Sequence, residues 1–482
     1  MRGTLLRVVF AAALLAEAGV AAAGLPPLVA RAFVEQHIPL GAVSAYVQEL
    51  GKTRPVFSHQ PTRAMSPAST MKLVTTFAAL ELLHPDYRWK TEAYADGKID
   101  GGVLQGDLVL KGYGDPKITV EQFQELVARL RATGLYTIRG DLIVDRSYFA
   151  PTPYDPGAFD AEPLRPYNVG PDALLVNFKS VRFAFAPNAA GDAVEIRAEP
   201  ALANIAVHGA PRLVAGECGD WKAGLLAAFD ARDDGANISF GGDYPAACGE
   251  RDWFIALLDP PHYVLGAFAR MWADAGGSFA GTVRDGRAPP GTLPIAVLQS
   301  PPLYDAVRDI NKLSNNVMAR QLFLTLATTL RPPPATAANA GHAIERWLER
   351  HKLRFPELVL DNGSGLSRRA RISAQSMARL LIAADRSDVR DEYVSSLAVA
   401  ATDGTVRRRF LSDDVADQAF LKTGTLEGVR AIAGYVFDPA GRRFVVVCFV
   451  NHRNALRAQL PLDLLVQWVY DHGHDAAQRA AR

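Results

Sequence analysis

Alternating hydrophobic and polar positions indicate strands near both ends of the chain. Residues 43–50 alternate well enough for one strand, and residues 430–439 and 442–452 are apolar runs joined by a Pro-Gly turn. Helical patterns fill the last third around them, in residues 300–327 and 460–473. A strand at the start, helices in the middle and strands at the end predict one sheet that is assembled from both termini.

The region between residues 93 and 290 differs in composition and in hydrophobic pattern. Glycine is frequent there, and short β-like runs such as DLVLKG, GDLIVD, AVEIRA and NIAVHG dominate. Two helix-like segments, residues 120–134 and 263–277, interrupt these runs. The pattern predicts one or two α+β domains inserted between the two halves of a flanking domain. A proline-rich patch near residue 290 marks the expected point of return.

The first 23 residues are typical of a cleaved secretory signal. Arg2 and Arg7 accompany an apolar run that is too short to span a bilayer, and Ala21–Ala23 offer small side chains to a signal peptidase before Gly24. The alternative is a core or anchoring helix. A cleaved signal predicts a periplasmic mature protein and is compatible with peripheral association with the membrane or the cell wall.

Composition and charge argue against a nucleic-acid-binding protein and against a metalloprotein. The 482 residues give room for about three domains. The 52 Lys and Arg against 51 Asp and Glu leave a net charge of +1, which gives no electrostatic case for a nucleic-acid partner. The 10 histidines lack metal-ligand spacing, and neither HExxH nor paired CxxC occurs, so we expect no metal site.

The three cysteines have two kinds of surroundings. Cys218 and Cys248 lie in polar, glycine-containing contexts, whereas Cys448 lies inside the apolar run FVVVCFV. In an exported protein, the first two are expected to form a disulfide and the third to be a buried thiol.

Ser69 and Lys72 are the first candidates for chemistry. They begin a predicted helix for which Ser66 is the expected N-cap and Pro67 the first helical residue. Their spacing places them on one helix face, so the amine can reach the hydroxyl. Serine needs a neighbouring base, and lysine is a base only when desolvation or another cation lowers its pKa. Taken alone, the pattern also fits an amphipathic helix with a surface lysine.

Two further motifs follow in the last third of the chain. Ser314 and Asn316 can face one cleft from a turn, although Ser and Asn also cap helices. Lys422 begins the sequence KTGT before an apolar strand, where a strand edge can bind an extended peptide. Its charge suits a substrate carboxylate or lowers the pKa of Lys72, and Gly424 lets the substrate approach the backbone. An ordinary turn is the alternative for this motif.

The ordered set S-x-x-K, S-x-N and K-T-G occurs in β-lactamases and penicillin-binding proteins. Over nearly the whole mature chain, the sequence resembles the penicillin-binding D-alanyl-D-alanine carboxypeptidase/endopeptidase family with large inserted domains. Residues 106–116, 167–181 and 360–368 extend the resemblance. The long interval between Ser69 and Ser314 also fits the inserted-domain group.

The resemblance implies an α+β fold. Its β-lactamase/transpeptidase-like domain, an antiparallel sheet plus a helical subdomain, is split by inserted β-rich domains. The implied boundaries are a signal peptide at 1–23, catalytic segments at 24–92 and 297–482, a first inserted domain at 93–177 and 259–296, and a second at 178–258.

The resemblance also implies roles. Ser69 is the acylated nucleophile, Lys72 its proton acceptor, Ser314 a proton relay near Lys422, and Asn316 a ligand of a substrate amide. The backbone N–H groups of Ser69 and Thr425 would form the oxyanion hole, and Thr423 and Thr425 would bind the terminal carboxylate beside Gly424. The implied partners are peptidoglycan stem peptides and β-lactam antibiotics, and the resemblance implies no cofactor. The oligomeric state stays open.

Three further residues are weaker candidates for substrate binding. Arg368 lies in a segment matching the family and is either a cleft residue or a surface arginine. Asp155 and Asp160 lie in a Pro/Gly-rich loop, where carboxylates can meet the ammonium group of a diamino acid or merely be solvated. The family tends to place tryptophan near these acids, whereas this chain has Ala158 and Phe159.

Two other functions remain in competition at this stage. A β-lactamase or esterase of the same fold would need an added glutamate base, for which Glu357 and Glu427 are the nearby candidates. A non-catalytic peptidoglycan-binding protein is the other alternative, and the intact Ser69, Lys72 and Lys422 argue against it.

Overall fold

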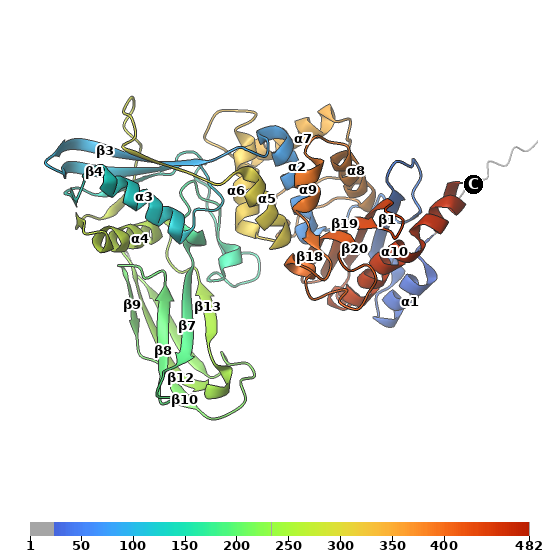
Figure 1. Ribbon diagram of the computed structural model, residues 1–482, viewed down its shortest axis with the longest axis horizontal. Coiled ribbons are helices and arrows are strands. Elements are labelled where there is room, and N and C mark those ends of the chain that lie inside the picture. Colours follow the sequence, from blue (N-terminus) through green and yellow to red (C-terminus); the bar gives the residue numbers. More distant parts are fainter. Residues whose placement is uncertain (1–23, 233, 482) are drawn as a thin grey trace, which may run out of the picture.

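The computed structural model describes residues 24–232 and 234–481, so the predicted signal peptide lies outside the described residues. Four sheets and their helices form three units that follow one another across the view of Figure 1. The core unit (residues 27–83 and 303–481) lies at the right. The hairpin unit (90–145 and 260–299) lies at the upper left, and the distal unit (181–255) extends below it. In the described range, no helix combines the length and apolar character needed to cross a membrane.

The central sheet of the core unit joins both ends of the described chain. Its order is β17-β18-β19-β20-β1-β2, and every neighbouring pair is antiparallel. The strands are β17 (Ala398–Val399), β18 (Ala419–Leu426), β19 (Val429–Phe437), β20 (Arg443–Asn451), β1 (Val43–Glu49) and β2 (Phe57–His59). The predicted sheet built from both termini is therefore confirmed.

Helices cover both faces of this sheet. Strand β20 divides its side chains by alternation: Val445 and Val447 join the core under the larger helical layer, whereas Val446 and Cys448 join the core under α1 and α10. The first layer contains α2 (Lys72–Leu83), α5 (Leu303–Lys312), α6 (Asn316–Ala327), α7 (Ala337–Arg350), α8 (Ala374–Asp385) and α9 (Arg390–Ser395). The second contains α1 (Pro27–Glu35) and α10 (Gln459–Ala481). As predicted, Cys448 is a free, buried thiol.

The hairpin unit is built on two long paired strands, β3 (Lys90–Asp100) and β4 (Val103–Gly112). Its seven-stranded sheet also contains β5 (Thr137–Ile138), β6 (Leu142–Asp145), β14 (Ser278–Phe279), β15 (Val283–Asp285) and β16 (Ala296–Gln299). Helices α3 (Val120–Ala132) and α4 (Pro260–Asp274) lie beside these strands (Figure 1) and match the two predicted helical segments. Strand β16 pairs with β3 just before the chain returns to the core unit.

The distal unit consists of two small sheets that share one apolar core. Its strands are β7 (Val181–Pro187), β8 (Val194–Glu199), β9 (Ile205–His208), β10 (Arg212–Val214), β11 (Leu225–Ala231), β12 (Ala236–Pro245) and β13 (Arg251–Ile255). Phe185 and Phe240 meet across the sheets with ring centroids 5.0 Å apart. The predicted Cys218–Cys248 disulfide is present in this unit.

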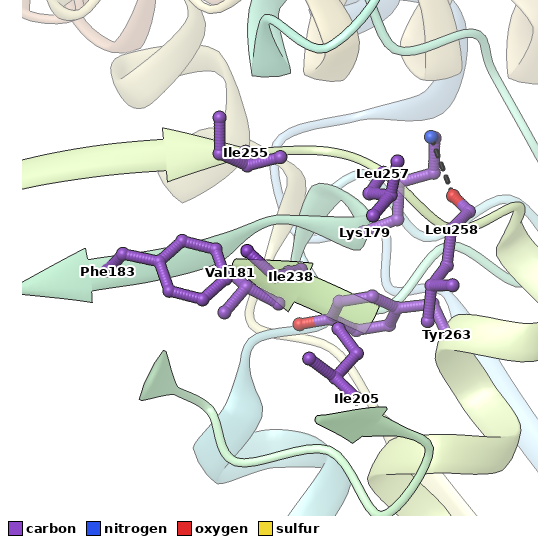
Figure 2. Close-up of a pocket in the computed structure, with 9 residues that line it drawn as sticks. All are labelled: Lys179, Val181, Phe183, Ile205, Ile238, Ile255, Leu257, Leu258 and Tyr263. Carbon is purple, nitrogen blue, oxygen red and sulfur yellow. Dashed lines mark hydrogen bonds between the residues drawn. The ribbon is translucent and has the colours of Figure 1, made fainter. Parts of the chain in front are cut away.

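The base of the distal unit meets α4 in a small apolar crevice (Figure 2). Aliphatic and aromatic side chains, including Ile205, Ile238 and Tyr263, line it. The Lys179 side chain points away from this apolar centre, and its Nζ donates to Ala256 O at 2.9 Å and to Leu258 O at 2.7 Å. The lysine thus satisfies backbone carbonyls at the end of β13.

The connecting segment, residues 146–180, links the hairpin and distal units and also packs on the core unit. Phe149 forms an isolated β-bridge with Ala335. The side chain of Gln321 on α6 binds the backbone of Asp172 twice, accepting from its N–H at 2.9 Å and donating to its carbonyl at 2.7 Å. The inserted region is therefore attached to a helix of the core unit.

Candidate active site

Ser69 lies in a 3₁₀ turn, η2 (Ala68–Met71), that runs directly into α2. The amide of Asn451 on β20 holds the preceding backbone, since its Oδ1 accepts from Ser66 N–H at 2.8 Å and its Nδ2 donates to Ser66 O at 3.1 Å. The prediction that Ser66 caps an α-helix beginning at Pro67 is wrong, because neither η2 nor α2 has a side-chain cap. A tertiary contact with the sheet fixes the turn instead.

The amine of Lys72 lies among three oxygens. Nζ is 2.9 Å from Ser69 Oγ, 2.7 Å from Asn316 Oδ1 and 2.6 Å from Ser364 O. The side chain is completely buried. A neutral amine can donate its two hydrogens to Asn316 and Ser364 and direct its lone pair at the Ser69 hydroxyl, which is the geometry of an activated serine.

Lys422 is a second completely buried lysine in the same site. It lies on β18, and its Nζ donates to Ser314 Oγ at 2.8 Å and to Thr423 O at 3.1 Å. Burial lowers the pKa of Lys422 to about 7. Burial also lowers the pKa of Lys72 well below its ordinary value, and the charge of Lys422 lowers it further. Lys422 can therefore exchange protons near neutral pH, and the neutral form of Lys72 is favoured.

The S-x-N motif divides its side chains between two tasks. Ser314, in the left-handed region with φ 59°, bonds Lys422, whereas Asn316 bonds Lys72. Asn315 between them caps α6 by accepting from Met318 N–H at 3.0 Å. The motif therefore serves both purposes considered from the sequence: Ser314 and Asn316 face the two lysines, and Asn315 caps the helix.

The KTGT strand passes close to the Ser69 turn. A Cβ on Gly424 would lie 2.7 Å from Pro67 O and 3.0 Å from Ser69 N. A glycine is needed here because the Ser69 turn comes so close to the strand. The reason predicted from the sequence is instead the approach of the substrate to the backbone. The hydroxyl of Thr425 accepts from Arg430 Nη1 at 2.6 Å on the exposed side of the strand.

The structure places Arg368 beside the KTGT strand. Its Nη2 is 3.4 Å from Glu427 Oε2, and its guanidinium carbon lies 4.6 Å from the centroid of the Phe159 ring. Phe159 thus brings the Pro/Gly-rich loop to this edge of the site. The ring packs on a small apolar cluster formed by Ala68, Leu366, Leu426 and Val429.

The two loop acids differ in their contacts. Asp160 accepts from Tyr167 Oη at 2.8 Å and from Asn168 Nδ2 at 2.7 Å, so it is part of the internal structure of the loop. Asp155 is exposed, and the one hydrogen bond that its carboxylate accepts within the described structure is from Gly157 N–H at 2.8 Å. Of the two, Asp155 has the carboxylate available for a ligand.

Several site residues were not predicted from the sequence. Ser364 contributes only its backbone carbonyl to Lys72, and the neighbouring Gly365 allows Ala68 O to approach within 1.9 Å of where a Cβ would stand. Arg320, one helical turn beyond Asn316, is buried and also lowers the pKa of Lys72. The four-residue spacing on α6 was the available signal for Arg320.

Carboxylates do not reach the nucleophile in the described structure. Glu357 accepts from Ser373 N–H at 3.1 Å, and Glu427 pairs with Arg368. Neither forms a hydrogen bond with Ser69, so the added base of the alternative β-lactamase mechanism has no candidate there. No group of three or more His, Cys, Asp or Glu side chains is placed to hold a metal ion in residues 24–232 and 234–481.

Comparison with known proteins identifies the family of this chain. The model of the D-Ala-D-Ala carboxypeptidase 3 (S13) family matches residues 30–469. D-alanyl-D-alanine carboxypeptidase DacB of Haemophilus influenzae is 25% identical over 421 residues, covering 86% of this chain and 87% of the relative. D-alanyl-D-alanine carboxypeptidase of Actinomadura sp. (strain R39) is 27% identical over 459 residues, covering 91% and 84%.

A solved structure confirms the predicted fold class. Penicillin binding protein 4 (dacB) from Haemophilus influenzae has a TM-score of 0.77 with this chain at 24% identity. The match covers 92% of this chain and 99% of that protein. Because coverage extends over both, the inserted region belongs to the shared fold and is not an addition peculiar to this chain.

Proposed function

Because the chain belongs to the D-Ala-D-Ala carboxypeptidase 3 (S13) family, we propose that it is a serine D-alanyl-D-alanine carboxypeptidase/D,D-endopeptidase that acts through an acyl-enzyme on Ser69. One observation carries the proposal: the buried amine of Lys72, with its lowered pKa, lies 2.9 Å from Ser69 Oγ. A neutral lysine at hydrogen-bond distance supplies the base that a serine nucleophile requires.

In acylation, Lys72 takes the hydroxyl proton as Ser69 Oγ attacks the carbonyl carbon of the penultimate D-alanine. The N–H groups of Ser69 and Thr425 would stabilise the oxyanion, and the close approach of Ser69 N to β18 at Gly424, where a Cβ would lie 3.0 Å from it, supports this pairing. Collapse of the tetrahedral intermediate breaks the C–N bond. The leaving amine receives its proton through Ser314, whose hydroxyl Lys422 contacts. Water then attacks the ester and regenerates Ser69.

The substrate would lie along the free edge of β18. Strand β17 pairs only with Phe420 and Leu421, so the β18 edge beyond them can bind an extended peptide. Asn316 would bind a substrate amide, and Thr423 and Thr425 the terminal carboxylate. The positive charge of Lys422 favours this anionic end.

The side chain of the stem peptide would meet the loop at Asp155 and Phe159, with Arg368 at its border. An exposed carboxylate suits an ammonium-bearing diamino acid, and the Phe159 ring of the same loop already carries a cation, Arg368. The S13 match also supports a cell-wall substrate. Export by the predicted 1–23 signal would place the enzyme in the periplasm, and the predicted boundaries at 93–177, 178–258 and 259–296 would separate the inserted domains from the catalytic segments.

A mass spectrum of the mature protein after incubation with penicillin, followed by peptide mapping, tests the proposal. We expect one adduct on the peptide that contains Ser69, and Ser69→Ala should lose both the adduct and D-alanine release. A control is Ser314→Ala, which leaves the nucleophile in place. Labelling that persists on Ser69→Ala would show that the nucleophile is another residue.

A further inference from the structure

Arg320 is a buried cation without a direct carboxylate partner in the described structure. It is 4% exposed and lies on α6, four residues after Asn316. In the described structure, its Nε has no hydrogen-bond partner and it forms no salt bridge. Burying a charge without a counter-charge costs stability, so such an arrangement calls for a compensating role.

The contacts of Arg320 all lead to the connecting segment. Its Nη1 donates to Val169 O at 2.8 Å and to Tyr167 O at 3.4 Å. The Tyr154 ring lies against the guanidinium, with the centroid 5.5 Å from the guanidinium carbon. The Tyr154 hydroxyl donates to Asn168 O at 2.7 Å, which closes the same loop. Asp155 directly follows this tyrosine in sequence.

We propose that Arg320 is a positioning residue with two tasks: its buried charge, one helical turn along α6 from the Asn316 that binds Lys72, sets the electrostatic surroundings of that amine, and its hydrogen bonds hold the substrate-facing loop against the acyl site. The inference rests on the proposed function of Lys72. If the inserted region acted on substrate choice alone, no residue would serve both it and the acyl site. The proposal gives Arg320 a task at each of these two places.

The charges around Lys72 support the first task. Lys422 on β18 and Arg320 on α6 are the charged groups that act on it, and Ser69, Asn316 and Ser364 contribute neutral oxygens. The pKa of Lys422 is about 7, so its charge fades as the pH rises. Arginine stays charged throughout this range. Arg320 therefore provides a repulsion that does not vanish when Lys422 loses its proton.

Charges around Arg320 itself do not cancel this effect. Tyr154 and Asp361 are the acidic groups whose interaction favours its charged form, and burial outweighs them to lower its pKa. Asp361 also faces Arg369, with Nη1 3.6 Å from its Oδ1. Asp361 is thus shared with Arg369, and the charge of Arg320 has no salt-bridge partner within the described structure.

The neighbouring Gln321 provides a matched control. It also binds the connecting segment, through the backbone of Asp172, but it carries no charge. Loss of Gln321 should loosen the segment without changing the field at Lys72. Comparing Arg320→Gln and Arg320→Met with Gln321→Met separates charge from attachment, and Arg320→Lys restores the charge alone.

The experiment measures the pH dependence of the second-order rate of acylation by a fluorescent penicillin. Removing a cation raises the pKa of Lys72, so the acid limb in Arg320→Gln and Arg320→Met should move up by about one pH unit. Arg320→Lys and Gln321→Met should keep the wild-type limb. Hydrogen exchange of residues 165–170 should be faster in both neutral Arg320 variants and in Gln321→Met.

Each outcome is decisive. An unmoved acid limb in both neutral Arg320 variants would overturn the charge task, and so would an equal movement in Gln321→Met. Unchanged exchange in residues 165–170 would overturn the attachment task. If one neutral variant does not fold, the other still tests both. Absence of wild-type labelling on Ser69 would instead contradict the proposed function itself.

Discussion

The acyl site and the distal unit deal with positive charge in opposite ways. At the site, Lys72, Lys422 and Arg320 are buried, and the salt bridges of the described structure include none of them. In the distal unit, Arg182 lies at the surface and forms ion pairs with three carboxylates. Its partners are Glu199, Glu250 and Asp252.

This difference distinguishes cations that serve catalysis from cations that only support the structure. A cation paired with carboxylates at the surface adds little stability, and the hydrogen bonds that Arg182 donates to its partners, Glu199 first, raise its pKa and favour the charged form. Buried like charges destabilise one another, which lowers the pKa of a lysine and makes it a base. The core unit therefore carries a cost in stability that the distal unit does not carry.

The largest effect should come from Lys72→Ala. Loss of the base should slow acylation of Ser69 by roughly 10²- to 10⁴-fold, the usual contribution of a general base. The measurement is the rate of labelling by a fluorescent penicillin. Lys98→Ala, which removes an exposed lysine of the hairpin unit, should label like the wild type. Rapid labelling of Lys72→Ala would mean that the site does not depend on its buried amine.

The second prediction concerns the distal unit alone. Replacing Cys218 and Cys248 together by serine should destabilise this unit by about 3–4 kcal/mol, because the disulfide closes a loop with a sequence separation of 30 residues. Denaturant unfolding measures the loss. Penicillin labelling in the absence of denaturant should be unchanged, since Ser69 and both lysines lie in the core unit. A labelling defect as large as that of Lys72→Ala would break the comparison.

Local patterns predicted much of the core unit. Alternation in β1 and the apolar runs of β19 and β20 were sufficient because both faces of the sheet are covered and nearly all side chains of these strands are buried. The motifs supplied Ser69, Lys72 and Lys422 because these residues act through their side chains. The ordered motif set was recognised, however, and was not deduced from the physics of any single motif.

Contacts made by the backbone or over long separations were not predictable. The carbonyl of Ser364 accepts from Lys72 whatever side chain position 364 bears. Asn451 replaces the expected Ser66 cap from 385 residues away in the sequence. Gly424 was assigned a substrate role, because the approach of the Ser69 turn became visible only in the fold.

The third prediction concerns the loss of folding stability that a buried cation causes. Lys422 has a pKa of about 7 in the fold and an ordinary value of 10.5 when unfolded, so between these values the unfolded chain binds more protons. Stability should therefore rise with pH across this interval. Lys422→Met should be more stable than the wild type by roughly 1–4 kcal/mol below pH 7, with the gain vanishing toward pH 10.5.

Thermal unfolding from pH 6 to pH 10 measures this gain, and peptidase assays should show that Lys422→Met has lost activity. A variant that is less stable than the wild type at pH 6 would contradict the argument, because it would mean that the Ser314 and Thr423 contacts outweigh the cost of burial.

The smallest effect is expected at the loop, where the two regions meet. Asp155→Ala should reduce kcat/KM for a diaminopimelate-containing peptide by about tenfold, which corresponds to one exposed charge-assisted contact. Penicillin acylation should hardly change, because penicillin has no such ammonium group. Asp155→Asn separates charge from shape and should behave like the alanine variant. Asp160→Ala should instead loosen the loop, since its carboxylate binds Tyr167 and Asn168. Full peptide activity in both Asp155 variants would show that Asp155 is a solvated loop residue without a role in substrate binding.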